Sequence, residues 1–260
     1  MIQFNIHRFG KVAKRSLTND KKYHWKSFLQ TLVILMLVFL FFTTSQNRIM
    51  VGQISYSYQA CCIATLVSFV VTIVLGPSFM FYSMDGKHDM QALMMLPASN
   101  FEKYLMRYAS WIILLPIHLV AFFAADLVQY IVNMLMGHDY TTFVTTCLVD
   151  VVIDTWHKIP AGLHVPIAVS AIFSIVWLHS CYALGATFFR SNKYNWVATT
   201  IVIILITIVQ LAIFPEGKEL INRMPSIMEV IVTLVWVILN FWLSYKLFCR
   251  QQVIGKFVNM

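Results

Sequence analysis

The chain has 260 residues, of which 59% are hydrophobic and 12% are charged, and its formal net charge at pH 7 is +8. Soluble domains are about 45–50% apolar and about 25% charged, so this composition cannot cover a surface that faces water. It excludes a disordered tail, a secreted disulfide scaffold and a large aqueous catalytic domain. The positive charge is interpreted as a topology signal and not as a nucleic-acid surface, because Lys and Arg orient membrane helices.

Long uncharged runs predict where the chain crosses the membrane. A helix needs about 20 mostly apolar residues to cross a hydrocarbon core of about 30 Å. Six such runs predict an all-α polytopic membrane protein with six transmembrane helices, at residues 28–45, 58–82, 108–130, 165–189, 195–214 and 227–247. We expect a basic leader over 1–27, a six-span domain over 28–250 and a tail over 251–260.

The basic residues divide unequally between the two sides that these spans define. Fifteen fall on the side of the termini: Arg8, Lys11, Lys14, Arg15, Lys21, Lys22, Lys26, Lys87, Lys103, Arg107, Arg190, Lys193, Lys246, Arg250 and Lys256. Four fall on the opposite side: Arg48, Lys158, Lys218 and Arg223. Because short loops rich in Lys and Arg stay in the cytoplasm, we expect both termini there, in a multi-pass protein of the inner (cytoplasmic) membrane.

The leader before the first span mixes apolar and basic residues. Its apolar positions alternate with cations, in the order Phe4, Arg8, Phe9, Lys11, Val12, Lys14, Arg15 and Leu17. This pattern is typical of a basic helix that lies on an anionic inner leaflet. A solvated leader that only sets topology fits the same residues, and both interpretations remain open.

The connection over residues 83–107 carries start and stop signals for two helices. Asp85 is placed to cap a short helix that ends before Pro97, since the residue before a proline disfavours the helical conformation. Ser99 precedes Glu102 by three residues, a capping box that opens the third span. The pattern therefore predicts a short helix parallel to the membrane and joined to a transmembrane rod. An ordinary capped loop is the alternative.

Within this connection, the run 87–104 (KHDMQALMMLPASNFEKY) resembles a known family. A Leu-Pro-x-Ser segment, here Leu96 to Ser99, is followed by Glu102 and leads into the third span. This is similar to the coupling-helix region of type-2 ABC transporter permeases, the exporter class. The position between the second and third spans of a six-span chain with a basic leader agrees with that class.

The resemblance implies a fold, partners and a docking site. The fold would be the six-helix exporter domain, working as a permease dimer with separate ATP-binding cassette ATPase subunits in the lipid bilayer. The residues expected to dock on the ATPase are Asp85, Lys87, Asp89, Met90, Leu93, Met94 and Leu96. The chain departs from the family in its outer connections, since the long one, 131–164, joins spans three and four, whereas 215–226 is short.

The outer connection 131–164 predicts an amphipathic helix on the outer membrane surface. One face carries apolar residues at helical spacing, and Asp150, Asp154 and His157 lie on the other. Two carboxylates and a histidine at this spacing are compatible with a divalent metal. Such residues on an exposed face are more often simply solvated, so we predict no metal site.

Polar residues inside the spans are candidates for a translocation path. A polar group at mid-bilayer is costly and usually faces a bundle interior or a cavity. His118 and His179 fall near the midplane, and Asn240 is a further candidate for lining a path. Asp126 lies near the outer end of its span, where we expect an interfacial position. Hydrogen bonding between helices, with no transport role, is the alternative for each residue.

Three functions are compatible with these features of the sequence. The first is the membrane subunit of an ATP-driven exporter, and because the chain has no Gly-x-x-x-x-Gly-Lys-Ser/Thr loop, another chain would hydrolyse the ATP. The second is an intramembrane protease or lipid-modifying enzyme, and the third is a membrane scaffold. We favour the exporter, with no catalytic residue, no cofactor and no nucleic-acid partner. The transported substrate is not readable from the sequence.

Overall fold

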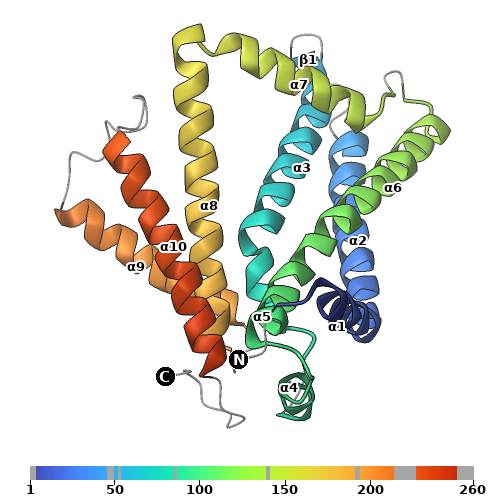
Figure 1. Cartoon of the computed structure of the whole chain (residues 1–260). Helices are drawn as coiled ribbons and strands as arrows, with labels where there is room; N and C mark the ends of the chain where they lie inside the picture. Colours follow the sequence, from blue (N-terminus) through green and yellow to red (C-terminus); the bar gives the residue numbers. More distant parts are fainter. Residues whose placement is uncertain are drawn as a thin grey trace. The chain divides into compact units, whose positions relative to one another are not determined.

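The computed structural model describes residues 4–45, 50–51, 54–84, 87–138, 141–190, 194–213 and 227–250. These residues form two compact units, one from Met1–Lys21, Ile73–Ile112 and Gly162–Met260, and the other from Lys22–Thr72 and Ile113–Ala161. Almost all of the secondary structure is helical (Figure 1). The predicted all-α class is therefore confirmed for the described part of the chain.

The elements follow one another along the chain as helices with short connections. The α-helices are α1 (Ile6–Asn19), α2 (Lys21–Ser45), α3 (Tyr56–Leu75), α4 (Lys87–Met94), α5 (Asn100–Ala109), α6 (Leu114–Leu135), α7 (Val144–Lys158), α8 (His164–Phe188), α9 (Asn195–Ile213) and α10 (Ile227–Cys249). The 3-10 helices of the described residues are η1 (Gly76–Phe81), η2 (Ser110–Ile113) and η3 (Ala161–Leu163). Two-residue strands, β1 (Met50–Val51) and β2 (Ile54–Ser55), pair antiparallel, with Val51 opposite Ile54.

Among the described residues, five helical segments are long and apolar enough to cross a membrane. They are Lys21–Thr44, Tyr56–Phe81, Asn100–Leu135, His164–Phe188 and Glu229–Cys249, and they overlap five of the six predicted spans. The remaining run, 195–214, includes α9, whose apolar stretch Asn195–Val209 is shorter than the about 20 residues that a crossing needs. The chain is thus a helical membrane protein, and the sixth crossing stays a prediction.

The first unit packs around an apolar cluster that joins helices far apart in sequence. The cluster includes Val12 from α1, Leu93 from α4, Tyr104 from α5 and Phe248 from α10. The Tyr104 hydroxyl also donates a hydrogen bond to Ser244 Oγ at 3.0 Å. Hydrogen bonds of this kind hold helices together in hydrocarbon, where burial of apolar surface supplies little preference for one helix pairing over another.

The second unit has its own core, built from α2, α3, α6 and the start of α7. Phe39 and Phe122 meet edge to face with ring centroids 6.1 Å apart, beside the buried Tyr58. Many large apolar side chains of the chain are exposed, among them Ile34, Leu37 and Phe41 on α2. Exposure on this scale is expected of a surface that faces lipid and not water.

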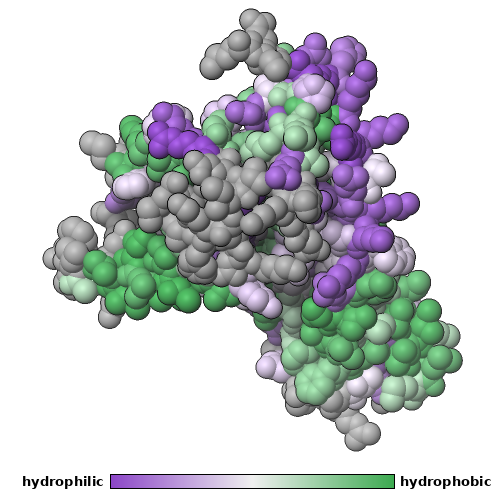
Figure 2. Space-filling model, turned by 90° about the horizontal axis from the view of Figure 1, so that it is seen from below, coloured by the Kyte–Doolittle hydropathy of each residue, from purple (hydrophilic) through white to green (hydrophobic). Residues whose placement is uncertain are grey.

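Helix α1 is a defined helix whose apolar side is used inside the protein. Val12 is buried and Phe9 and Ala13 pack against the cluster of the first unit. Lys11, Lys14 and Arg15 are exposed, and Figure 2 shows hydrophilic side chains gathered in a row on the side where α1 lies. Part of the apolar side of α1 therefore packs on the protein and the helix keeps a basic outer face, while its placement on the inner leaflet stays a prediction beside the solvated alternative.

Candidate functional site

Helix α4 carries most of the residues predicted to dock on a partner. Asp85 lies outside the described residues, and Lys87 and Met90 belong to α4. The Asp89 side chain is exposed, but Leu93 is only 5% exposed and packs into the apolar cluster of the first unit.

Two more of the predicted docking residues also face the protein. Met94 and Leu96 are half-buried against the same cluster as Leu93. Three other residues of this segment are instead exposed, namely Gln91, Ala92 and Met95, and Met95 reaches 83% exposure. The exposed residues of α4 and the turn after it are therefore Asp89, Gln91, Ala92 and Met95, and the sequence alone did not separate them from the packed residues.

The capping box predicted at Ser99 and Glu102 is present at the start of α5. The Glu102 N–H donates to Ser99 Oγ at 3.2 Å, and the Ser99 N–H donates to Glu102 Oε2 at 2.8 Å. The buried Glu102 carboxylate also accepts from the Asn5 N–H at 2.7 Å and from two nitrogens of Arg8 at 2.8 and 2.7 Å. One side chain thus caps α5 and anchors the start of α1.

A second ion pair joins the end of α1 to α5. Arg107 Nη1 lies 2.7 Å from Asp20 Oδ2, and both side chains are almost completely buried. The guanidinium also donates to Ser16 Oγ and to Ser83 Oγ, each at 3.1 Å. Arg107 therefore holds α1, α5 and the turn after η1 in one arrangement.

Helix α4 is fixed to α5 by a buried lysine. Lys103 Nζ donates to the carbonyl oxygen of Met94 at 2.7 Å. A cation near the last carbonyls of a helix is favourable, because those groups have no partner within the helix and carry the negative end of its dipole. Beside this contact, a polar cleft of about 310 Å³ is lined by residues of α1, α4 and α5, including Arg15, Asp20, Asp89 and Arg107.

His179, predicted near the midplane of its span, is buried and makes two hydrogen bonds. Nδ1 lies 2.7 Å from the carbonyl oxygen of Ile73, and Nε2 lies 2.7 Å from the Tyr108 hydroxyl. A carbonyl only accepts, so Nδ1 carries the proton of this hydrogen bond. Trp111 stands edge-on at 4.8 Å between centroids. His179 thus connects three helical segments.

His118 also hydrogen-bonds to a neighbouring helix. Its Nε2 lies 3.2 Å from Ser68 Oγ and its Nδ1 lies 3.3 Å from Thr72 Oγ1, both on α3. His118 and His179 are not among the residues that line the pocket described next. Their contacts match the interhelical alternative, and their role on a translocation path stays a prediction.

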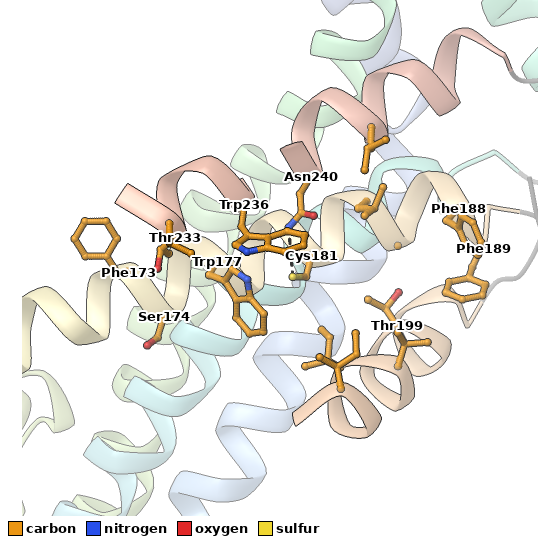
Figure 3. A pocket seen from close by; sticks show the side chains of 17 residues that line it. Phe173, Ser174, Trp177, Cys181, Phe188, Phe189, Thr199, Thr233, Trp236 and Asn240 are labelled. Atoms are coloured by element: carbon orange, nitrogen blue, oxygen red, sulfur yellow. Dashed lines mark hydrogen bonds between the residues drawn. The ribbon is translucent and has the colours of Figure 1, made fainter. Parts of the chain in front are cut away.

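Asn240, the third predicted path residue, lines a large pocket between α8, α9 and α10 (Figure 3). The pocket has a volume of about 810 Å³ and contains aromatic side chains from Trp177, Trp236 and Phe188. The polar side chains among the described residues that line it are neutral, and none of those residues is Asp, Glu, Lys, Arg or His. The sequence did not predict this pocket, because its walls come from three separate helices.

The packing of α8 against α9 beside this pocket depends on a glycine. A Cβ atom built at Gly185 would overlap the side chain of Thr199 on α9. Only glycine therefore allows the two helices to approach this closely, as is common for small residues at membrane helix contacts. The contact sets one wall of the pocket, since both residues line it.

Asp126, expected near the outer end of its span, is enclosed within the protein. Its carboxylate is buried and accepts from the N–H groups of Val144 at 2.7 Å and Thr145 at 2.9 Å, and from the Thr145 hydroxyl at 2.6 Å. These are the first residues of α7, whose own N-cap, Phe143, supplies no side-chain hydrogen bond. Asp126 thus caps α7 from α6, where a carboxylate also favours the positive end of the helix dipole.

A helix is present in the connection that was expected to hold an outer amphipathic one, namely α7, and its position on the outer membrane surface stays a prediction. The candidate ligands Asp150, Asp154 and His157 are exposed on it, and Asp154 pairs with Lys158 at 2.6 Å. Among the described residues, no group of three or more His, Cys, Asp or Glu is arranged to hold a metal ion. This face therefore offers no argument for a metal in the part of the chain that the structure describes.

Comparison with known proteins found no family model, no curated protein and no solved structure that matches this chain. The class of the protein consequently follows from its own residues. The apolar helices, their lipid-facing surfaces and the buried polar contacts between them define a helical membrane protein. Two features of it have the form of functional sites, namely the short helix α4 on its ion-paired support and the pocket between α8, α9 and α10.

Proposed function

We propose that this chain is the membrane-spanning permease subunit of an ATP-driven ABC exporter. A separate ATP-binding cassette ATPase subunit docks on α4 and hydrolyses ATP, and two permease chains form the transporter in the cytoplasmic membrane. The substrate moves across that membrane. Two observations support the proposal: the resemblance of the run 87–104 to the coupling-helix region, and the way α1, α4 and α5 pack together.

The main support for the proposal is the way α4 is attached to the rest of the first unit. The helix presents Met95 at its end to the surroundings, while Leu93 and the Met94 carbonyl hold it to the first unit. Buried ion pairs tie the supporting α5 to α1, and α5 leads through η2 into the third span. A push on α4 would therefore move a packed assembly and not a single loop, as packed elements transmit displacement as units.

The proposal requires that the chain crosses the membrane six times. Helix α9 is counted as a span, so that both termini and α4 lie in the cytoplasm. The charge distribution supports this, because the side that holds the termini carries fifteen of the nineteen Lys and Arg residues. An ATPase in the cytoplasm would then reach α4 directly.

The decisive experiment is a test of partner retention with matched substitutions. The tagged full chain is purified from its own cells in mild detergent, and ATP hydrolysis by the purified material is measured. Met95→Asp is compared with Met136→Asp, since both methionines are exposed, at 83% and 58%. We expect Met95→Asp to lower ATPase recovery at least about tenfold, because a charge replaces an apolar contact at a docking surface. Met136→Asp should leave recovery unchanged.

Two outcomes contradict the proposal. If wild type retains no ATP-hydrolysing subunit, the chain is not an exporter subunit of this class, and a scaffold function is favoured. If both variants retain the ATPase as wild type does, α4 is not its docking element. The intramembrane-enzyme interpretation is favoured by no arrangement of polar groups among the described residues.

A further inference from the structure

The pocket between α8, α9 and α10 has the dimensions of a ligand site. Its volume of about 810 Å³ lies within the range of about 300–1,000 Å³ that is typical of such sites. The α8 side runs from Phe173 to Phe189, which is about 24 Å along the helix at 1.5 Å per residue. The pocket is therefore long as well as large, which suits an extended molecule.

The walls of the pocket select against charge. Figure 3 shows the rings of Trp177 and Trp236 beside Asn240, with Phe173 and Phe188 farther along the pocket. Burial of an ion among such neutral groups is costly without a paired charge. Two of the walls belong to membrane-spanning segments, so the surroundings of the pocket are hydrocarbon. An occupant must be neutral over most of its length and soluble in the bilayer.

The hydrogen bonds of Asn240 fix the orientation of its side-chain amide. The side chain is only 7% exposed, and its Nδ2 donates to Ser180 Oγ at 3.0 Å and to Cys181 Sγ at 3.5 Å. The hydroxyl hydrogen of Ser180 is engaged by the carbonyl oxygen of Trp177 at 2.7 Å, so Ser180 accepts from Asn240. This requirement fixes the orientation of the amide, with nitrogen toward Ser180.

The amide oxygen, Asn240 Oδ1, can then accept a hydrogen bond from a ligand. The hydrogen bonds that Asn240 makes to other described residues use Nδ2, so the acceptor Oδ1 has no partner among them. Asn240 lines the pocket, and an acceptor that faces apolar walls without a partner costs free energy, which a ligand with an O–H or N–H donor relieves. Asn240 therefore favours a ligand that brings a donor to this point of the pocket.

We propose that this pocket binds a neutral, lipid-like amphiphile: a long apolar chain with a hydroxyl or amide N–H group that donates to Asn240 Oδ1. The aromatic and aliphatic walls hold the chain, and Asn240 sets its register. The proposal deepens the proposed function and rests on it only in one respect, that such an amphiphile would be the cargo. Binding itself requires no ATPase.

A pair of photoactivatable probes tests the proposal on the purified full chain in lipid nanodiscs, with no ATPase present. One probe is a long-chain alcohol with a diazirine in the chain, and the other is its methyl ether, which lacks the donor. We expect the alcohol to label pocket peptides about tenfold more than the ether does, since this is the order of the loss when a hydrogen bond inside a pocket is not made. In Asn240→Leu, the two probes should label equally.

Matched substitutions on α10 separate the pocket from the general lipid surface. Thr233 lines the pocket, whereas its neighbour Leu234 is exposed and does not. We expect Thr233→Trp to fill the pocket and abolish labelling of its peptides by either probe, while Leu234→Trp leaves wild-type labelling. Elution of each variant as a single species shows that it has folded, and the wild-type comparison of the two probes needs no variant.

Three results would overturn the assignment. Equal labelling of wild type by the alcohol and the ether would mean that ordinary lipid fills the groove without recognition. Unchanged labelling of Thr233→Trp would place the probe elsewhere. Cross-links from the pocket to a second copy of the chain would make this surface a dimer contact. If the purified chain retains no ATPase but the alcohol still labels the pocket more than the ether does, the transport function is contradicted and the binding site is supported.

Discussion

Arg107 and Asp20 lie 87 positions apart in the chain and form a buried ion pair at 2.7 Å. Loss of one partner leaves the other charge buried without compensation, which typically costs about 3–5 kcal/mol. We therefore predict that Asp20→Asn markedly lowers the unfolding temperature of the purified chain, measured by tryptophan fluorescence in detergent.

The exposed pair Asp154–Lys158 provides the control for this prediction. Both of its side chains are mostly exposed, and pairs of this kind contribute about 0–1 kcal/mol. Asp154→Asn should leave the unfolding temperature nearly unchanged. An equal effect of the two substitutions would show that the buried pair does not hold α1 to α5.

Cys147 on α7 is a buried free thiol outside the membrane-spanning segments. Burial raises the pKa of the Cys147 thiol, with a smaller contribution from the charge of Asp150. Because the thiolate is the reactive form, a raised pKa lowers the reactive fraction at any pH below it. We predict that maleimide labelling of Cys147, followed by peptide mass spectrometry, is slow at pH 7.5 and accelerates only above pH of about 8.5.

Thr146→Cys supplies the comparison for Cys147. Thr146 is the preceding residue of α7, and its side chain is exposed. A thiol there should react faster than Cys147 throughout this pH range. Equally fast labelling of both positions would mean that the start of α7 opens readily.

The capping box and the ion pair differ in how far the sequence predicts them. Ser99 and Glu102 are three residues apart, so their geometry follows from the helix itself. Asp20 and Arg107 meet only because α1 folds onto α5, and nothing in either local sequence specifies that partner. The same holds for the Asn5 and Arg8 contacts of Glu102, which the sequence pattern did not predict.

At the level of elements, α7 depends on a cap from another helix. Asp126 accepts from the N–H groups of Val144 and Thr145, which are otherwise without a helical partner. We predict that Asp126→Leu destabilises the start of α7 by about 1–2 kcal/mol, as loss of an N-cap does. Faster amide hydrogen exchange in the first turn of α7 is the measurement.

Asp150→Leu is the control for the cap, because Asp150 is exposed on α7 and takes no part in capping it. Its exchange in the first turn should stay as in wild type. Unchanged exchange in Asp126→Leu would show that packing alone, through Val144 and Cys147, holds this helix end.

The contact between α8 and α9 gives a second prediction at this level. Because a Cβ at Gly185 overlaps Thr199, Gly185→Ala must push the helices apart, at a cost of about 1–3 kcal/mol for overpacking. Thermal unfolding of the purified variant measures this cost. Gly162→Ala is the matched control, since a Cβ there meets nothing within 4 Å. Similar stability of both variants would mean that α9 does not pack at Gly185.

For the whole molecule, the number of crossings decides on which side the chain ends. If α9 spans the membrane, Arg190 and Arg250 lie on the same side, because α9 and α10 cross between them. We predict this arrangement, in the cytoplasm, from side-specific reporter fusions made after Arg190 and after Arg250. Reporters on opposite sides would reduce the crossings to five and remove the shared location of the termini.

The sequence by itself determined the features that depend on composition and short spacing. Hydrophobic runs of sufficient length specify spans, because the bilayer thickness is fixed, and charge asymmetry predicts their orientation. Five spans, the short helix α4, the amphipathic helix α7 and the capping box were predictable for this reason.

Only the tertiary structure decided which faces meet. Which side of α4 and of α1 is packed, the cap from Asp126 and the pocket around Asn240 depend on residues tens of positions apart. In lipid, all outer faces are apolar, so hydrophobicity does not distinguish a helix contact from a lipid contact. Close approach at Gly185 and a few buried polar pairs make that choice, and they create the pocket in which we place a ligand.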